Sequence, residues 1–259
     1  MDSITSTRSP RVARARALKT RAGRRESGLF LVEGPGGVAA AIAAGICQEV
    51  WATDSGARLI DAIPDVAMSD RVSEIVSDTE TPQGVFAICH QPRADLDEVC
   101  ARPGPLVWAD GVSDPGNLGT IIRTVWALGA AGVVTSNHGV DPFNGKVVRA
   151  SAGAICEVPV VPDVPIEKVI SALHAHERPV VVLAGEAERD VFAALRESLV
   201  TPRACWVLGS ESHGVCAEIR RSSSHELRIP LPGGAESLNA GVAASVALYA
   251  AWNHLGPWT

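Results

Sequence analysis

Three short stretches of the chain collect the polar residue types that bind and orient substrates. They are DGVSDPGNLG (110–119), SESHG (210–214) and LPGGAESLN (231–239), and each follows a predicted strand. Ligands of open parallel α/β sheets bind beyond the carboxyl ends of the strands, where such loops meet. The sequence therefore predicts that these three loops, far apart along the chain, converge on one ligand site.

The first stretch continues into an apolar helix that carries an arginine in its middle. Asp114 can cap this helix, and Pro115 is tolerated in its first turn. Arg123 lies one turn after Gly119 on the same face, and its planar guanidinium suits a phosphate. We interpret Arg123 as facing a ligand. The alternative is an arginine that extends into solvent or bonds to carbonyls of its own helix.

Several common signatures are missing from the sequence. It contains no G-x-x-x-x-G-K-[ST] loop, no G-x-G-x-x-G after a strand and no G-x-S-x-G. The six cysteines and seven histidines show no metal-binding spacing, so we expect reduced thiols and no metal. No apolar run reaches the roughly 18 residues of a membrane span, and the N-terminus does not have the pattern of a secretory signal. We therefore expect a cytoplasmic protein without a membrane partner.

Charge is unevenly distributed along a chain of otherwise ordinary composition. Hydrophobic residues make up 46% and charged residues 20%, and the formal net charge is -6. Residues 1–25 nevertheless hold eight arginines and lysines against Asp2 alone. A basic arm on an acidic body favours a nucleic-acid partner, and we predict RNA contacts by Arg8, Arg11 and Arg16. A solvated basic helix without a partner is the alternative.

The order of the predicted elements indicates an α/β protein with two domains. We predict a small α/β domain over 1–92, a linker over 93–104, and a larger domain over 105–259 whose parallel sheet is buried on both faces. Predicted helices span 8–22, 38–45, 56–62, 70–77, 116–129, 165–175, 215–221 and 237–252. Predicted strands span 29–34, 49–53, 84–89, 106–110, 132–136, 156–160, 179–184, 204–209 and 225–230.

Four stretches of the second domain resemble the SpoU/TrmH family of RNA 2'-O-ribose methyltransferases. DPGNLGTIIRT (114–124), LGSESHGV (208–215) and IPLPGGAESLNAGVAASVAL (229–248) are similar to its three motifs, and RASAGAICEVPV (149–160) is similar to a stretch between them. The N-terminal sequence, through GLFLVEG (28–34), resembles the family's accessory RNA-binding domain, which is related to kink-turn-binding ribosomal proteins. The resemblance covers nearly the whole chain.

The resemblance implies a fold and an activity that spacing alone does not. Family members tie the C-terminal segment into a deep trefoil knot, bind S-adenosylmethionine in it and act as homodimers. Carried over by motif, the catalytic residues would be Asn117, Arg123, Ser237 and Asn239. The cofactor pocket would be formed by Gly209, Ile229 and Leu238, with Glu211 supporting its loop. The alternative role for Asn117 is to bond the backbone of its own site.

Three positions depart from the family pattern. Ser210 stands where the second motif usually has Asn, and Gly241 stands where the third motif often has a second Ser. The loop VEGPGGV (32–38) lacks the basic residue often found after VEGP, which weakens an RNA-contacting role for it and leaves Glu33 as a capping or positioning residue.

The leading function is therefore methylation of a ribose 2'-hydroxyl in ribosomal RNA, most readily that of the large subunit, because the basic accessory domain accompanies the ribosomal branch. A tRNA ribose methyltransferase is the nearest alternative. A non-catalytic RNA-binding or ribosome-assembly protein is a second, although Arg123 and Asn239 argue against it. A small-molecule enzyme on a doubly wound sheet is a third, which the arginine-rich arm disfavours.

Overall fold

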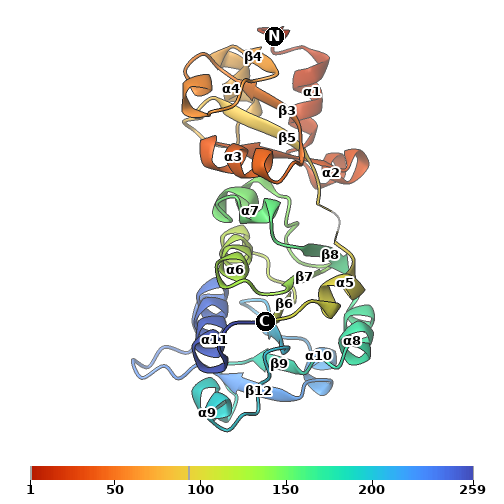
Figure 1. The fold of residues 1–259 in the computed structure, drawn as a ribbon, viewed down its shortest axis with the longest axis vertical. Helices are drawn as coiled ribbons and strands as arrows, with labels where there is room; N and C mark the ends of the chain where they lie inside the picture. The colour runs from red at the N-terminus through yellow and green to blue at the C-terminus, as the bar shows by residue number, and fades with distance from the viewer. Residues whose placement is uncertain (1, 93, 259) are drawn as a thin grey trace. The chain divides into compact units, whose positions relative to one another are not determined.

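The computed structural model describes residues 2–92 and 94–258, which form two compact units (Figure 1). One unit contains the chain up to Pro92 together with Phe143–Glu157, and the other contains the rest. The segment 143–157 lies within the predicted second domain but packs with the first unit.

The first unit is built on a five-stranded mixed sheet, which agrees with the prediction of a small α/β domain. The strand order is β1(Asp2–Ile4), β4(Val66–Met68), β3(Cys47–Ala52), β5(Val85–His90), β2(Leu29–Glu33). Strand β4 pairs in parallel with both its neighbours, whereas β5 pairs antiparallel with both of its own. The helical segments of this unit are α1(Pro10–Ala17), α2(Arg21–Ser27), α3(Pro35–Ala43), η1(Gly56–Leu59), α4(Asp70–Val76), α7(Gly145–Ala150) and η2(Ala154–Cys156).

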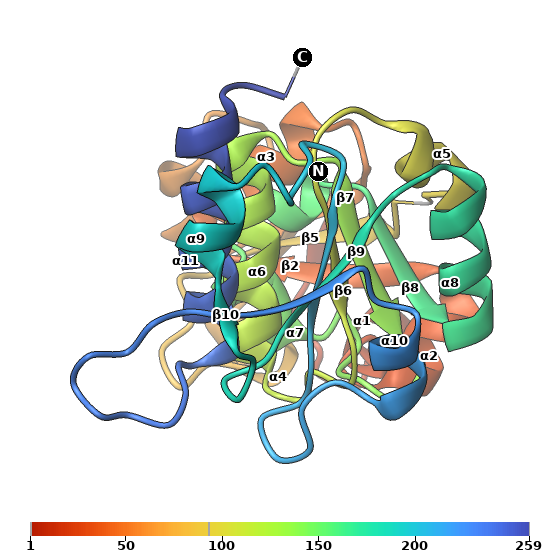
Figure 2. The same cartoon turned by 90° about the horizontal axis from the view of Figure 1, so that it is seen from below.

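The second unit is a seven-stranded parallel sheet covered by helices on both faces, as predicted. Its strand order is β10(Arg189–Asp190), β12(His225–Arg228), β9(Val180–Leu183), β11(Cys205–Leu208), β6(Leu106–Ala109), β7(Gly132–Ser136), β8(Val160–Val164). One face is covered by α6(Pro115–Leu128), α9(Val191–Arg196) and α11(Ala240–Leu255) (Figure 2). The other is covered by α5(Leu96–Ala101), α8(Ile166–Ala175) and α10(Ala217–Arg221), which enclose an apolar core with the sheet.

Helices α6 and α11 lie against each other because small residues face the contact. Gly241 allows this approach, since a Cβ there would lie 2.8 Å from the Thr120 Cβ. One turn further along, the hydroxyls of Thr124 and Ser245 are hydrogen-bonded at 2.7 Å. The two helices that carry the first and third motifs therefore pack so closely that they favour a glycine at position 241, where the family often has a second Ser.

Three predicted elements differ from the observed ones for local reasons. The helix expected over 8–22 is two helices, because α1 ends at Ala17 with Leu18 as its C-cap, and Thr20 caps the start of α2 by accepting from the Gly23 amide at 3.1 Å. The strand expected at 156–160 begins at Val160, because the 3₁₀ turn η2 occupies 154–156. Within the expected linker lies α5, whose Val99 and Cys100 belong to the core of the second unit.

Candidate active site

Asn117 joins the three predicted loops through its side chain. Its Nδ2 donates to Glu211 Oε1 in the second motif, and its Oδ1 accepts from Asn239 Nδ2 in the third at 2.6 Å. Its backbone amide donates to the cap residue Asp114 at 2.8 Å. Asn117 is only 5% exposed, whereas Glu211 and Asn239 are exposed. The predicted convergence of the three loops is thus confirmed, and we call these three side chains the Asn117 network.

The second-motif loop is a closed turn held by its own backbone. The amides and carbonyls of Ser210 and Gly214 bond to each other at 2.9 and 3.1 Å. Gly209 is required here, because a Cβ at this position would overlap the backbone of Gly214. The Ser210 hydroxyl accepts from the amide of His213 at 3.1 Å. The serine that departs from the family pattern therefore stabilises the turn.

The third-motif loop contains one residue that caps a helix and one serine whose hydroxyl is exposed. Asn239 Oδ1 accepts from the Val242 amide at 3.2 Å and so caps α11, while its Nδ2 bonds to Asn117. Ser237 is exposed and forms no hydrogen bond to any residue that the structure describes. Ile229 and Leu238 are half-buried, so each offers some apolar surface to a ligand.

Arg123 lies outside the Asn117 network. Its guanidinium is exposed and forms no hydrogen bond or ion pair within the described part of the chain. It lines a groove together with Thr120, Thr124 and Tyr249. The structure therefore places Asn117 and Arg123 on α6 and Ser237 and Asn239 in the loop that leads into α11, and it leaves Arg123 free to contact a ligand.

The outer face of α6, α9 and α11 is unusually apolar. Five large apolar side chains of this unit are exposed there: Trp126, Phe192, Val242, Tyr249 and Trp252. The rings of Tyr249 and Trp252 lie 5.8 Å apart. Because exposed apolar patches of this kind mark interaction sites, this face is a candidate surface for a second protein chain.

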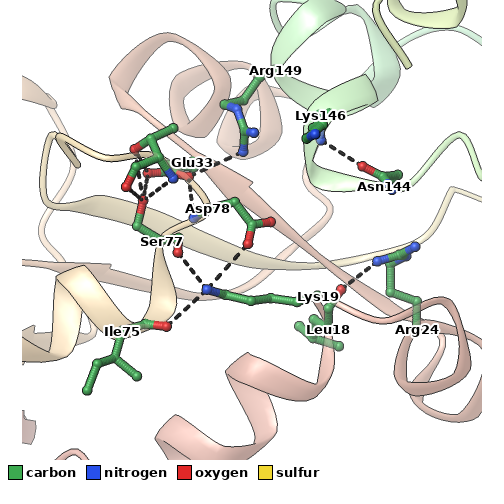
Figure 3. A network of polar contacts seen from close by, with 11 residues as sticks. Leu18, Lys19, Arg24, Glu33, Ile75, Ser77, Asp78, Asn144, Lys146 and Arg149 are labelled. Carbon is green, nitrogen blue, oxygen red and sulfur yellow. Dashed lines mark hydrogen bonds and ion pairs between the residues drawn. The ribbon is translucent and has the colours of Figure 1, made fainter. Parts of the chain in front are cut away.

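Some arginines of the N-terminal basic arm form no ion pair with the described residues, whereas others bond within the fold. Arg8 and Arg16 are exposed and free of ion pairs with described residues, whereas Arg11 pairs with Asp2 at 2.9 Å. Arg24 is 2% exposed and donates to the Leu18 carbonyl at 2.8 Å, as Figure 3 shows. The predicted arm is therefore two ordered helices, in which part of the positive charge maintains the fold.

Lys19, in the same basic stretch, also forms its contacts within the fold. Its Nζ donates to the carbonyls of Ile75 and Ser77 at 3.0 and 2.5 Å and lies 3.3 Å from Asp78 Oδ1 (Figure 3). These acceptors lie at the end of α4 and just after it, so the lysine compensates carbonyls that the helix leaves without intrahelical donors.

Glu33, at the end of β2, is a positioning residue. Its Oε1 accepts from the hydroxyls of Ser77 and Thr79, the latter at 2.8 Å. Its Oε2 lies 3.5 Å from Arg149 Nη1 on α7 (Figure 3). We call these four side chains the Glu33 network. The expectation that Glu33 has a positioning role agrees with these contacts, and the charge of Arg149 is directed to it.

One buried carboxylate at the sheet edge was not identified from the sequence. Asp110 follows β6, is 2% exposed, and accepts from the Ser136 hydroxyl at 2.8 Å and the Cys216 amide at 3.2 Å. It therefore connects the ends of β6 and β7 to the start of α10, where Cys216 is the N-cap residue. The local signal in the sequence was an aspartate at the end of an apolar strand. Its two hydrogen-bond partners lie 26 and 106 residues away in the sequence, so the contacts could not be read from it.

All six cysteines are free thiols, in agreement with the expectation of reduced cysteines. Burial raises the pKa of the Cys156 thiol to about 12, so this thiol is protonated at neutral pH. Among the described residues, no three His, Cys, Asp or Glu side chains gather as a metal site requires. No helix in the described ranges is both long and apolar enough to cross a membrane.

The fold and the loop network define a two-unit α/β protein whose candidate ligand site lies at the carboxyl edge of a parallel sheet. The chain belongs to the SpoU rRNA methylase family, which it matches over residues 105–249. Residues 9–87 match the MRM3-like substrate binding domain.

Individual relatives match over nearly the full length of the chain. The chain is 33% identical over 253 residues to the 23S rRNA (guanosine(2553)-2'-O)-methyltransferase RlmP of Bacillus subtilis, covering 96% of this chain and 98% of the relative. The structure is similar to an S-adenosylmethionine-bound rRNA methyltransferase from Sinorhizobium meliloti, with a TM-score of 0.86, 27% identity and 98% of each chain covered. It is also similar to the cofactor complex of AviRb from Streptomyces viridochromogenes, with a TM-score of 0.84 and 27% identity over 95% of this chain and 98% of that one.

Proposed function

We propose that this protein transfers a methyl group from S-adenosylmethionine to a ribose 2'-hydroxyl of 23S rRNA. The observation that carries the proposal is the Asn117 network, which brings the three family motifs together at one sheet edge. The 23S rRNA specificity is supported by relatives that align over nearly the whole chain, including the substrate-binding unit. A tRNA substrate and a non-catalytic assembly role are the alternatives.

The residues of the second and third loops suit S-adenosylmethionine. This ligand needs polar backbone groups for its amino-acid part and adenine edge, and apolar surface for the ring faces. The closed turn at 209–214 offers backbone groups, and the half-buried Ile229 and Leu238 offer apolar surface. Glu211 would hold the turn against Asn117. When bound, the cofactor would supply an electrophilic methyl group on its sulfonium.

The protein's part in the reaction is to orient the ribose hydroxyl, which releases its proton to solvent as the oxygen–methyl bond forms and the sulfur–methyl bond breaks. Holding both reactants in line can lower the barrier by several kcal/mol, roughly 7 or more in the best cases. Arg123 is a phosphate anchor and a donor to the developing alkoxide, because a guanidinium does not lose its proton at neutral pH. Asn117, Ser237 and Asn239 set the loop geometry and supply hydrogen bonds to hydroxyls.

The protein acts as a homodimer whose interface is the apolar face of α6, α9 and α11. Four of the five exposed side chains on these helices are aromatic, a kind that is enriched at interfaces. Arg123 lines the groove on the same face, so a partner subunit docked there would border the reactive arginine. This arrangement explains why Arg123 lies outside the Asn117 network within one chain.

The remaining family features are part of the same proposal. The C-terminal segment forms a deep trefoil knot, the substrate-binding and methyltransferase domains divide at the linker 93–104, and Arg8, Arg11 and Arg16 bind RNA phosphates. The protein works in the cytoplasm, where its rRNA substrate is assembled into the large subunit.

The proposal is tested by incubating the protein with labelled S-adenosylmethionine and either unmodified 23S rRNA or bulk tRNA. We expect label in 23S rRNA at one ribose that resists alkaline cleavage. Arg123→Ala should abolish transfer while leaving cofactor affinity unchanged. Label only in tRNA would support the nearest alternative. Absence of label, with intact RNA binding and intact cofactor binding, would contradict catalysis.

A further inference from the structure

His138 contacts the buried carboxylate of Asp110 and lies outside the stretches that resemble the family motifs. His138 Nε2 lies 3.3 Å from Asp110 Oδ1, and its Nδ1 lies 3.2 Å from the Oδ1 of Asn137. The histidine side chain is 52% exposed, whereas that of Asp110 is 2% exposed. One edge of the ring is therefore fixed against the protein while the rest faces solvent.

The Asp110 carboxylate that contacts this ring is itself held by hydrogen bonds at both oxygens. Asp110 Oδ1 accepts from Ser136, whose hydroxyl in turn accepts from the indole nitrogen of the fully buried Trp108 at 3.2 Å. The second carboxylate oxygen accepts from the Cys216 amide. A histidine oriented by a hydrogen-bonded carboxylate is pre-organised, because the bond fixes both its tautomer and its ring plane.

The backbone also makes room for this ring. Gly111 has a φ of +66°, and a Cβ built on it would lie 2.9 Å from two atoms of the His138 ring. The same point is 3.8 Å from the Cβ of Ser210, so the histidine lies beside the second-motif turn. The loop that carries His138 is itself fixed, since the Val140 amide donates to the Val112 carbonyl at 2.9 Å.

The strand order places His138 after β7, on the other side of β6 from the strands that precede the proposed cofactor residues. The proposed cofactor residues follow β11 and β12, which lie on one side of β6, and Asn117 follows β6 itself. His138 follows β7, which lies on the other side of β6. A cofactor bound by the β11 and β12 loops leaves the β7 side of the first motif for the RNA.

We infer that His138 contacts the RNA substrate next to the methylated ribose, with Asp110 as the positioning residue that orients its ring. With its Nε2–H held by Asp110, the neutral ring can accept from a 2'-hydroxyl at Nδ1 and can stack on an unpaired base, and both are usual modes of single-strand RNA recognition. The inference rests on the proposed function, because it concerns the substrate of the same reaction.

The test compares His138→Ala, His138→Gln and the wild type on protein-free 23S rRNA. A control variant, His174→Ala, removes an exposed histidine from α8, which covers the opposite face of the sheet from α6. For His138→Ala we expect a KM for RNA about fivefold to tenfold higher, which is the usual effect of losing one hydrogen bond. The affinity for S-adenosylmethionine and the melting temperature should stay at wild-type values. His138→Gln, which keeps both a donor for Asp110 and an acceptor, should recover part of the loss.

Three results would overturn the inference while the wild type remains active. They are an unchanged KM for RNA, an equal loss of cofactor affinity, and a lower melting temperature with unchanged kinetics. An effect of the same size in His174→Ala would also overturn it. An inactive wild type would instead contradict the proposed function, so the two failures are distinguishable.

Discussion

Each unit contains a buried polar side chain that gathers side chains from distant parts of the chain, but the two networks differ in exposure. Glu33, whose side chain is 8% exposed, bonds to Ser77 and Thr79 and faces Arg149. In the Asn117 network the buried member is the amide, while Glu211 and Asn239 are exposed. A buried, fully bonded carboxylate stabilises a fold, whereas a network open on one side can bind a ligand.

The largest effect is expected from breaking the open network at its buried centre. Asn117→Ala removes the partner of both Glu211 and Asn239, so we expect kcat for methyl transfer to fall at least about 100-fold, or about 2.7 kcal/mol in the barrier. Single-turnover kinetics on 23S rRNA would measure this. A variant that keeps more than about a tenth of the wild-type rate would show that the network is structural only.

The second effect should fall on stability rather than on catalysis. Glu33→Gln replaces one acceptor oxygen of the carboxylate with an NH2 donor, and it removes the charge facing Arg149. We expect the free energy of unfolding to fall by about 2 kcal/mol, measured by urea denaturation. The kcat of the folded fraction should be unchanged. A loss of kcat with unchanged stability would reverse the distinction between the two networks.

A third variant separates the two bonds of Asn239. Asn239→Ser keeps a side chain that can cap α11 but loses the bond to Asn117. We expect about a tenfold loss of kcat and a change in unfolding free energy within about 0.5 kcal/mol. Asn239→Ala serves as the control, and it should lose about 1 kcal/mol of stability in addition, because the cap is removed.

The smallest effect concerns the basic helices of the five-stranded unit. Arg8 and Arg16 are free to bind phosphates, so the double variant Arg8→Gln, Arg16→Gln should lower the slope of log affinity against log salt by roughly one to two. Arg11→Gln should change the slope less, because Arg11 already pairs with Asp2. Filter binding to 23S rRNA fragments over a salt series would measure both. Equal slopes in the double variant and the wild type would exclude these arginines from the RNA interface.

Local sequence was enough to predict the elements that carry the site. The Asp114-Pro115 start of α6 and the apolar strand runs each contain their own signal, because capping and burial depend on neighbouring residues. The same runs predicted the parallel sheet and the convergence of its loops, since parallel strands place their carboxyl ends on one edge. The partition of the basic stretch was not predictable, because the acceptors of Lys19 lie 56 and 58 residues away and leave no signal in its local sequence.

The sequence by itself determined an α/β protein with three polar loops at one sheet edge and an N-terminal excess of positive charge. Only the tertiary structure decided which charges are free: Lys19 meets acceptors 56 and 58 residues away, and Arg149 meets Glu33 across more than a hundred residues. It likewise decided that Asp110 supports His138, since packing brings together strands whose separation in sequence carries no pairing signal. Long-range polar contacts depend on the whole fold, whereas caps, turns and strand periods depend on a few adjacent residues.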